Sequence, residues 1–73
     1  GNQIARFSVQ GMHCASCRKL VVRTLLRQPG ILEVEVDLST GQGQMRYDPT
    51  RANVSEALRA VDGLGMGYRA ELV

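Results

Sequence analysis

The sequence is short of the features that define several protein classes. It has no tryptophan, one phenylalanine and two tyrosines, which is too few for the base-stacking surfaces of single-strand nucleic-acid-binding proteins. No apolar run approaches the roughly 20 residues that cross a bilayer, and no secretory signal pattern is present. The net charge is only +2. We therefore expect no nucleic-acid partner, no membrane insertion and a cytoplasmic location.

Cysteine is also scarce. The only two cysteines, Cys14 and Cys17, stand three positions apart in "GMHCASC" (residues 11–17). One such pair cannot form the disulfide framework of a small secreted domain. Three interpretations remain from the spacing alone: a metal site, a redox-active pair, or two small buried side chains.

Four segments alternate apolar and polar residues, as strands with one solvent-facing side do. They cover residues 4–10, 31–38, 44–47 and 68–73. The turn-like "STGQG" (39–43) between the second and third predicts an antiparallel hairpin. In the second strand, acidic residues alternate with the side chains that we expect to face the core, which are Leu32, Val34, Val36 and Leu38.

Two further segments have helical spacing of apolar residues. The first covers about residues 15–28 and ends before Pro29, because a proline disfavours helix at the preceding residue; Leu26 lies off its apolar stripe and should be partly exposed. The second lies in "NVSEALRAVDGLG" (53–65). Asn53 is placed as an N-cap with Glu56 three residues later, as in a capping box, and the glycines at 63 and 65 end the helix.

The order of elements is strand, helix, strand, strand, helix, strand, and every strand has one apolar face. Both helices should therefore cover the same side of a four-stranded antiparallel sheet. This is the α+β class with the ferredoxin-like βαββαβ arrangement. Residues 1–73 should form one domain, near the lower size limit for a single stable core.

This fold predicts where the cysteines lie. Gly11 to Cys14 would form the loop after the first strand, and Cys17 would lie in the first turn of the first helix. Backbone N–H groups and the helix dipole there favour thiolate over thiol, and Arg18 and Lys19 add positive charge. Two thiolates without a certain third ligand suit a soft monovalent ion, with Cu(I) the natural choice, whereas zinc normally needs four ligands.

The stretch "GMHCASC" resembles the GMxCxxC signature of the heavy-metal-associated domain, which occurs in copper chaperones and in amino-terminal domains of copper-transporting P-type ATPases. The likeness extends to "QPGI" (28–31), "YDP" (47–49) and "GYRA" (67–70). It implies the ferredoxin-like fold, Cu(I) held by Cys14 and Cys17, and metal transfer between similar domains. Ag, Hg, Cd and Zn ions are other candidates for the same thiols. The chain departs from the family at Gln28, where an apolar residue is common, and in a longer loop at 63–67.

Four residues are candidates for auxiliary roles near the metal. Met12 is expected to be a buried tether rather than a ligand. His13 is expected in solvent, as an occasional ligand or pH-sensitive neighbour. Met66 lies in the 63–67 loop, which should pack beside the cysteine loop, and could be a soft contact. Tyr68 is expected in the core at the start of the last strand, shielding the site.

The function predicted from the resemblance is soft-metal binding and transfer without enzymatic activity. The first hypothesis is a Cu(I) metallochaperone that delivers copper to a copper-transporting ATPase by thiolate exchange. The alternative is the metal-binding domain of such an ATPase, and a remote alternative is a thiol–disulfide oxidoreductase. Cu(I) could also bridge two copies into a homodimer. Docking on an acidic partner domain is assigned to a basic stripe on the first helix, made of Arg18, Lys19, Arg23 and Arg27.

Overall fold

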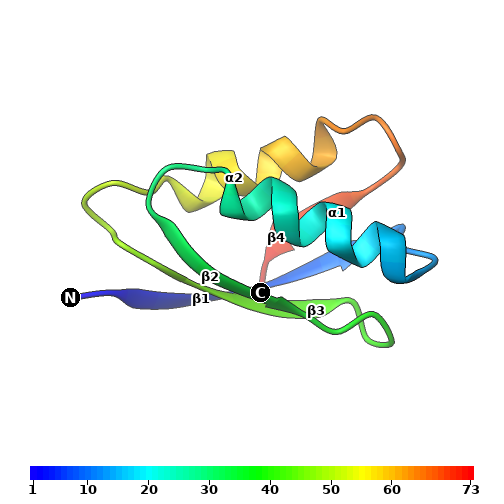
Figure 1. Cartoon of the computed structure of the whole chain (residues 1–73), viewed down its shortest axis with the longest axis horizontal. Coiled ribbons are helices and arrows are strands. Elements are labelled where there is room, and N and C mark those ends of the chain that lie inside the picture. The colour runs from blue at the N-terminus through cyan, green and yellow to red at the C-terminus, as the bar shows by residue number, and fades with distance from the viewer.

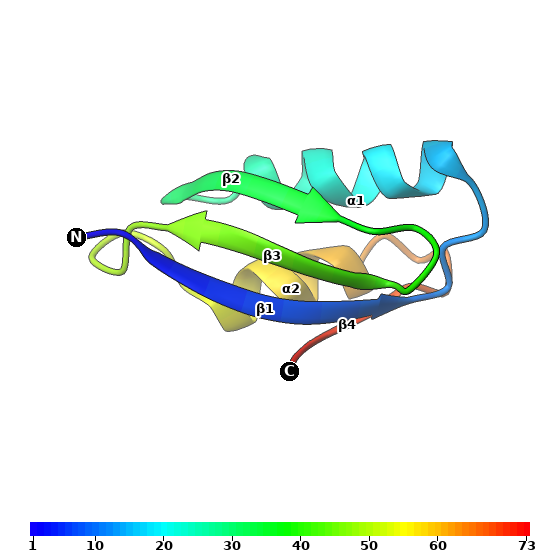
Figure 2. The ribbon, with the colours of Figure 1, turned by 90° about the horizontal axis from the view of Figure 1, so that it is seen from below.

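The computed structural model describes residues 1–73 and contains four strands and two helices. In chain order they are β1 (Gln3–Gln10), α1 (Ala15–Leu26), β2 (Ile31–Val36), β3 (Gln42–Tyr47), α2 (Val54–Asp62) and β4 (Arg69–Leu72). The strands form one sheet in the order β2-β3-β1-β4, and all neighbours are antiparallel. Both helices lie on the same face of the sheet (Figure 1), and the other face carries no element (Figure 2). The predicted ferredoxin-like arrangement is confirmed. Neither helix is long and apolar enough to cross a membrane.

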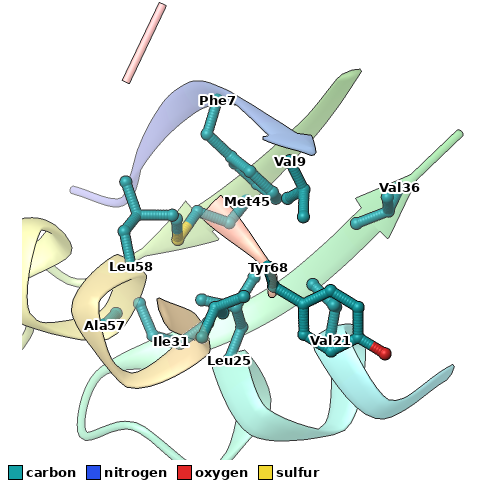
Figure 3. Close-up of a cluster of buried hydrophobic side chains, with 11 residues drawn as sticks. Phe7, Val9, Val21, Leu25, Ile31, Val36, Met45, Ala57, Leu58 and Tyr68 are labelled. Atoms are coloured by element: carbon teal, nitrogen blue, oxygen red, sulfur yellow. The ribbon is translucent and has the colours of Figure 1, made fainter. Parts of the chain in front are cut away.

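The core lies between the sheet and the two helices. The central strand β1 contributes Phe7, which is fully buried, and Val9, and α1 contributes Val21 and Leu25. Burying side chains of this size stabilises the fold by about 1.5–3 kcal/mol each. Figure 3 shows them packed together. The complete buried cluster is Phe7, Val9, Val21, Leu25, Ile31, Val36, Met45, Ala57, Leu58, Val61 and Tyr68.

The alternation predicted for β2 is wrong at its first residue. A β-bulge lies between Ile31 and Glu33, and the extra residue shifts the inward-facing position by one. Ile31 is therefore 7% exposed and Leu32 is 41% exposed. The pattern beyond the bulge is as predicted, with Val34 half-buried and Val36 buried.

Helix α1 ends two residues before its predicted end. Its last residue is Leu26, and the N–H of Arg27 closes the last turn by donating to the carbonyl of Arg23 at 3.2 Å. Gln28 leaves the helix, which accords with the restriction that Pro29 places on the residue before it. Leu26 is 45% exposed, so its expected exposure is confirmed.

Helix α2 begins after Asn53 and ends before Gly63, as predicted. The Asn53 side chain accepts a hydrogen bond from the N–H of Glu56 at 3.1 Å, which satisfies one of the free donors of the first turn. At the other end, Gly63 has a φ of −70° and is not a left-handed cap. The first left-handed residue after the helix is Gly65, with a φ of +72°. The carboxylate of Asp62 accepts from the N–H of Ala70 at 2.8 Å, which ties the helix end to β4 across the intervening loop.

Candidate metal site

Two loops meet at one end of the long axis of the molecule. They are the β1–α1 loop, which carries the first cysteine, and the α2–β4 loop (Figures 1 and 2). Gly11 in the first loop has a φ of +96°, and a Cβ atom there would lie 2.6 Å from the carbonyl oxygen of Gly67 in the second. Only glycine permits this approach of the two backbones. The α2–β4 loop therefore packs against the cysteine loop, as predicted.

The two thiols are close together and free. Cys14 occupies the N-cap position of α1, and its side chain makes no capping hydrogen bond. Cys17 is half-buried in the first turn, and the two sulfurs are 3.4 Å apart. No acidic residue lies in that turn. The positive end of the helix and the absence of nearby carboxylates favour negative charge on both sulfurs.

The Cys17 thiol is more acidic than an ordinary cysteine thiol. Its pKa is lowered from 9.0 to about 7, first by the Tyr68 hydroxyl, then by the backbone of His13 and by the Cys14 thiol. Each of these groups interacts more favourably with the thiolate than with the thiol. About half of the Cys17 side chains would therefore be thiolate at pH 7, which is the form that binds soft metals.

Tyr68 is the one buried polar side chain at this end of the core. It is 3% exposed, and its hydroxyl has no hydrogen-bond partner. Figure 3 shows the ring beside Val21 with the hydroxyl at the edge of the core. The pKa of Tyr68 is raised to about 12 by its interaction with Cys17, by burial and by the charge of the thiolates. The expected burial of Tyr68 is confirmed, and its hydroxyl is turned towards the site.

The other predicted auxiliary residues lie in three environments. Met12 is half-buried against the core, which accords with a tether. His13 is exposed, and no group of three His, Cys, Asp or Glu side chains is assembled anywhere in the chain. His13 is thus not brought to the two thiols as a third ligand. Met66 is 58% exposed in the α2–β4 loop.

The donor set fits a soft ion of low coordination number. Zinc normally takes four ligands, and no such set of His, Cys, Asp or Glu side chains is assembled. A metal–thiolate bond is about 2.3 Å long, so two such bonds in line need sulfurs about 4.6 Å apart. The observed separation is 3.4 Å. One ion can therefore contact both sulfurs only if the two bonds are bent, or if the exposed Cys14 side chain moves outward.

The predicted basic stripe is present beside the cysteines. Arg18 is half-buried, and Lys19, Arg23 and Arg27 are exposed. None of these four cations has an ionic partner, because the chain contains one ion pair, between Arg46 and Glu33. Together with two apolar side chains of α1, the four cations line a shallow hollow of about 360 Å³; its lining residues are Arg18, Lys19, Val22, Arg23, Leu26 and Arg27.

The opposite face of the sheet is unlike an RNA-binding surface. Phe7 and Tyr68 are buried, and Tyr47 packs against the core, so no aromatic side chain stands on the open face. Acidic residues of β2, including Glu33 and Glu35, are exposed there.

The fold and the cysteine loop define a small metal-binding domain, and comparison with known proteins identifies which kind. Residues 6–68 match the family described as the heavy-metal-associated domain, and the chain belongs to this family. It is 34% identical over all 73 residues to "Copper-transporting ATPase 1" of Mus musculus, of which it spans 5%.

Solved structures give the same assignment. The copper chaperone of Enterococcus hirae in its apo form has a TM-score of 0.84 and 29% identity, over 94% of this chain and 98% of that one. The amino-terminal domain of a potential copper-translocating P-type ATPase of Bacillus subtilis, in the Cu(I)-loaded state, has a TM-score of 0.87 and 29% identity, over 99% and 88%. The chain is thus related both to chaperones and to ATPase domains.

Two features of the site were not predicted from the sequence. One is the environment of the Tyr68 hydroxyl; the only signal for it in the sequence is a hydroxyl on a residue that is expected in the core. The other is the contact of Gly11 with Gly67. Two glycines adjoining a functional loop can indicate close backbone approach, but which glycine meets which follows only from the fold.

Proposed function

We propose that this domain is a Cu(I) metallochaperone, which binds one Cu(I) between Cys14 and Cys17 and delivers it to a copper-transporting ATPase. The observation that carries the proposal is the pair of free sulfurs 3.4 Å apart at an exposed end of the molecule. Two soft thiolates select Cu(I) over harder ions. The copper-related names of its relatives support the same metal.

Transfer would proceed by ligand exchange. A thiolate of the partner forms a bond to the ion as a bond to one thiolate of this chain breaks, and a second exchange completes the handover. Copper stays Cu(I) throughout, so no electron donor or acceptor is required. Cys14 is the more exposed thiol, so its bond is the first to exchange with an incoming partner.

The partner would dock on α1 next to the cysteines. The four unpaired cations there attract an acidic surface, and such attraction raises the association rate in a salt-dependent way. The hollow between them also presents Val22 and the 45%-exposed Leu26. A partner with carboxylates around a small apolar centre would complement this surface, and a metal-binding domain of a copper-transporting ATPase is the partner we propose.

A second candidate is the amino-terminal metal-binding domain of a copper-transporting ATPase itself. It is favoured by the identity of 34% over the whole chain to a segment of the mouse ATPase. The metal chemistry is the same in both cases. The family assignment lends no support to a thiol–disulfide oxidoreductase.

Copper binding is tested by competition with a colorimetric Cu(I) chelator. We expect one Cu(I) per chain, and loss of tight binding in both Cys14→Ser and Cys17→Ser, because one thiolate cannot compete with a chelator that supplies several donors. The apo variants should remain folded, since the core does not include the metal. Full retention of Cu(I) by either variant would refute the assignment. Gel filtration with and without Cu(I) tests whether the ion bridges two copies.

The docking surface is tested by transfer kinetics to an acidic metal-binding domain of a copper-transporting ATPase. The double reversal Lys19→Glu, Arg23→Glu should slow transfer by about tenfold at low salt, the lower end of what electrostatic steering contributes. Its matched control is Arg51→Glu, Arg59→Glu, which changes the net charge equally at exposed positions outside α1 and away from the cysteine loop. Equal slowing by both pairs would mean that net charge alone acts, and the α1 surface would be rejected.

A further inference from the structure

The chain has three methionines, and the structure places them in three environments. Met45 is 1% exposed in the core, and Met12 packs half-buried against it. Met66 is 58% exposed at the cysteine end of the molecule. Packing accounts for Met45 and Met12, since methionine fills irregular gaps in cores. It does not account for Met66, whose side chain gains little burial.

The segment that carries Met66 is held against the cysteine loop on its C-terminal side. Gly67 follows directly, and its carbonyl oxygen lies against Gly11. Tyr68 is next, and it is buried. Met66 is therefore one residue from a contact with the cysteine loop and two from the buried residue whose hydroxyl lowers the pKa of Cys17.

The backbone around Met66 has room on its N-terminal side. Gly65 has a φ of +72°, and no atom of the surrounding chain lies within 4 Å of the position of a Cβ there. Glycine exchanges between left- and right-handed conformations at little cost. Rotation at Gly65 can therefore reorient the exposed Met66 side chain while Gly67 stays against Gly11.

We propose that Met66 supplies a thioether sulfur as a third, weak ligand to the Cu(I) held by Cys14 and Cys17. The inference rests on the proposed function. A thioether is a soft donor that suits Cu(I). At the observed sulfur separation of 3.4 Å, the two bonds to one ion would be bent, and a bent pair would leave one side of the ion open to a third donor.

A neutral third ligand has a specific use in a transfer site. It keeps the ion in contact with the domain while one thiolate detaches, and it adds no negative charge that would oppose release. The ion is therefore released to a partner more easily than it would be from a site with three thiolates. The long, unbranched side chain of methionine can follow the ion over a short displacement.

The test is X-ray absorption on protein in which all three methionines are selenomethionine, loaded with one Cu(I). Spectra at the copper edge count Cu–S bonds, and spectra at the selenium edge detect a copper neighbour. We expect a Se–Cu distance in the parent and in Met12→Leu, and none in Met66→Leu. Chelator competition should show Cu(I) affinity about tenfold lower in Met66→Leu, the low end of the cost of removing a supporting group from a metal site. Met12→Leu is the matched control because it removes a methionine from the cysteine loop itself.

The outcomes separate this inference from the proposed function. Two Cu–S bonds without a Se–Cu distance would overturn the role of Met66 and leave Cu(I) binding by the cysteines intact. Absence of Cu–S bonds would overturn both. A Se–Cu distance that is lost in Met12→Leu and kept in Met66→Leu would assign the third ligand to Met12 and refute the proposal. Slower transfer by Met66→Leu with no Se–Cu distance in the parent would make Met66 a partner contact, which also refutes it.

Discussion

Removing the Tyr68 hydroxyl should make Cys17 less acidic. Tyr68→Phe deletes one oxygen atom and keeps the ring that packs beside Val21 (Figure 3). The hydroxyl is the largest of the groups that lower the pKa of Cys17 to about 7. Without it the pKa should rise towards 9.0, the value for a thiol without these interactions. The backbone of His13 still favours the thiolate, so the rise should be incomplete.

The effect is large enough to measure at neutral pH. A thiol with a pKa near 7 is about half thiolate at pH 7, and one near 9 is about one hundredth thiolate. Tyr68→Phe should therefore reduce the thiolate population of Cys17 severalfold. The rate of alkylation by iodoacetamide, measured against pH, reports that population because only the thiolate reacts. The comparison is between Cys14→Ser and the double variant Cys14→Ser, Tyr68→Phe, because Cys14 would react as well and because its own thiol lowers the pKa of Cys17.

The second tyrosine provides the control. The Tyr47 hydroxyl donates to Gln3 at 3.1 Å, at the opposite end of the sheet from the cysteines, so Tyr47→Phe should leave the alkylation profile unchanged. An unshifted profile in Tyr68→Phe would refute the interaction of the hydroxyl with Cys17. A shift in both variants would show that the effect comes from altered folding rather than from the hydroxyl.

Three further predictions concern stability, measured by denaturant unfolding of the apo protein. Gly43→Ala should cost about 1–3 kcal/mol by overpacking, because its Cβ would lie 2.7 Å from the buried Phe7 ring; Gly63→Ala, with its nearest contact at 3.4 Å, should be neutral, and equal effects of the two would contradict this. Asn53→Ala should cost about 1 kcal/mol by removing the N-cap, and an unchanged midpoint would show that the hydrogen bond does not contribute. Stability should rise between about pH 7 and pH 9, because the unfolded thiol keeps its proton there while folded Cys17, with its lowered pKa, has lost it. This rise should be absent in Cys17→Ser, and a fall over the same window would refute the sign.

The fold could be predicted from the sequence because each element carries its own local signal. Alternation identified the strands, and Asn53 with Glu56 identified the start of α2, since both signals depend on near neighbours in the chain. The register of β2 was predicted incorrectly at Leu32 for the same reason. A bulge is decided by pairing with β3, which a pattern within one strand does not contain.

The site was predictable to the extent that its chemistry lies in one short segment. Cys14 and Cys17 are three residues apart, so their proximity follows from a loop and one helical turn. Tyr68 and Gly67 reach the same place from 51 and 50 residues beyond Cys17, through the crossing of β4 beside β1. The resemblance to the family named the thiols as the metal ligands, but it could not show that the Tyr68 hydroxyl lacks another partner.

The end of the domain at which Gly1 lies can be attached to a surface without covering the cysteines. The N-terminus lies at the opposite end of the long axis from the cysteine loop in both views (Figures 1 and 2), and the molecule is 34 Å long in that direction. A domain fixed to a sensor surface through Gly1 would point its thiols into solution, with α1 accessible along its side. Lys19 is the only lysine of these 73 residues, and it stands on the docking surface. Amine coupling of a Lys19→Arg variant would therefore yield one uniform orientation, in which every immobilised copy could exchange copper with a partner in the flowing solution.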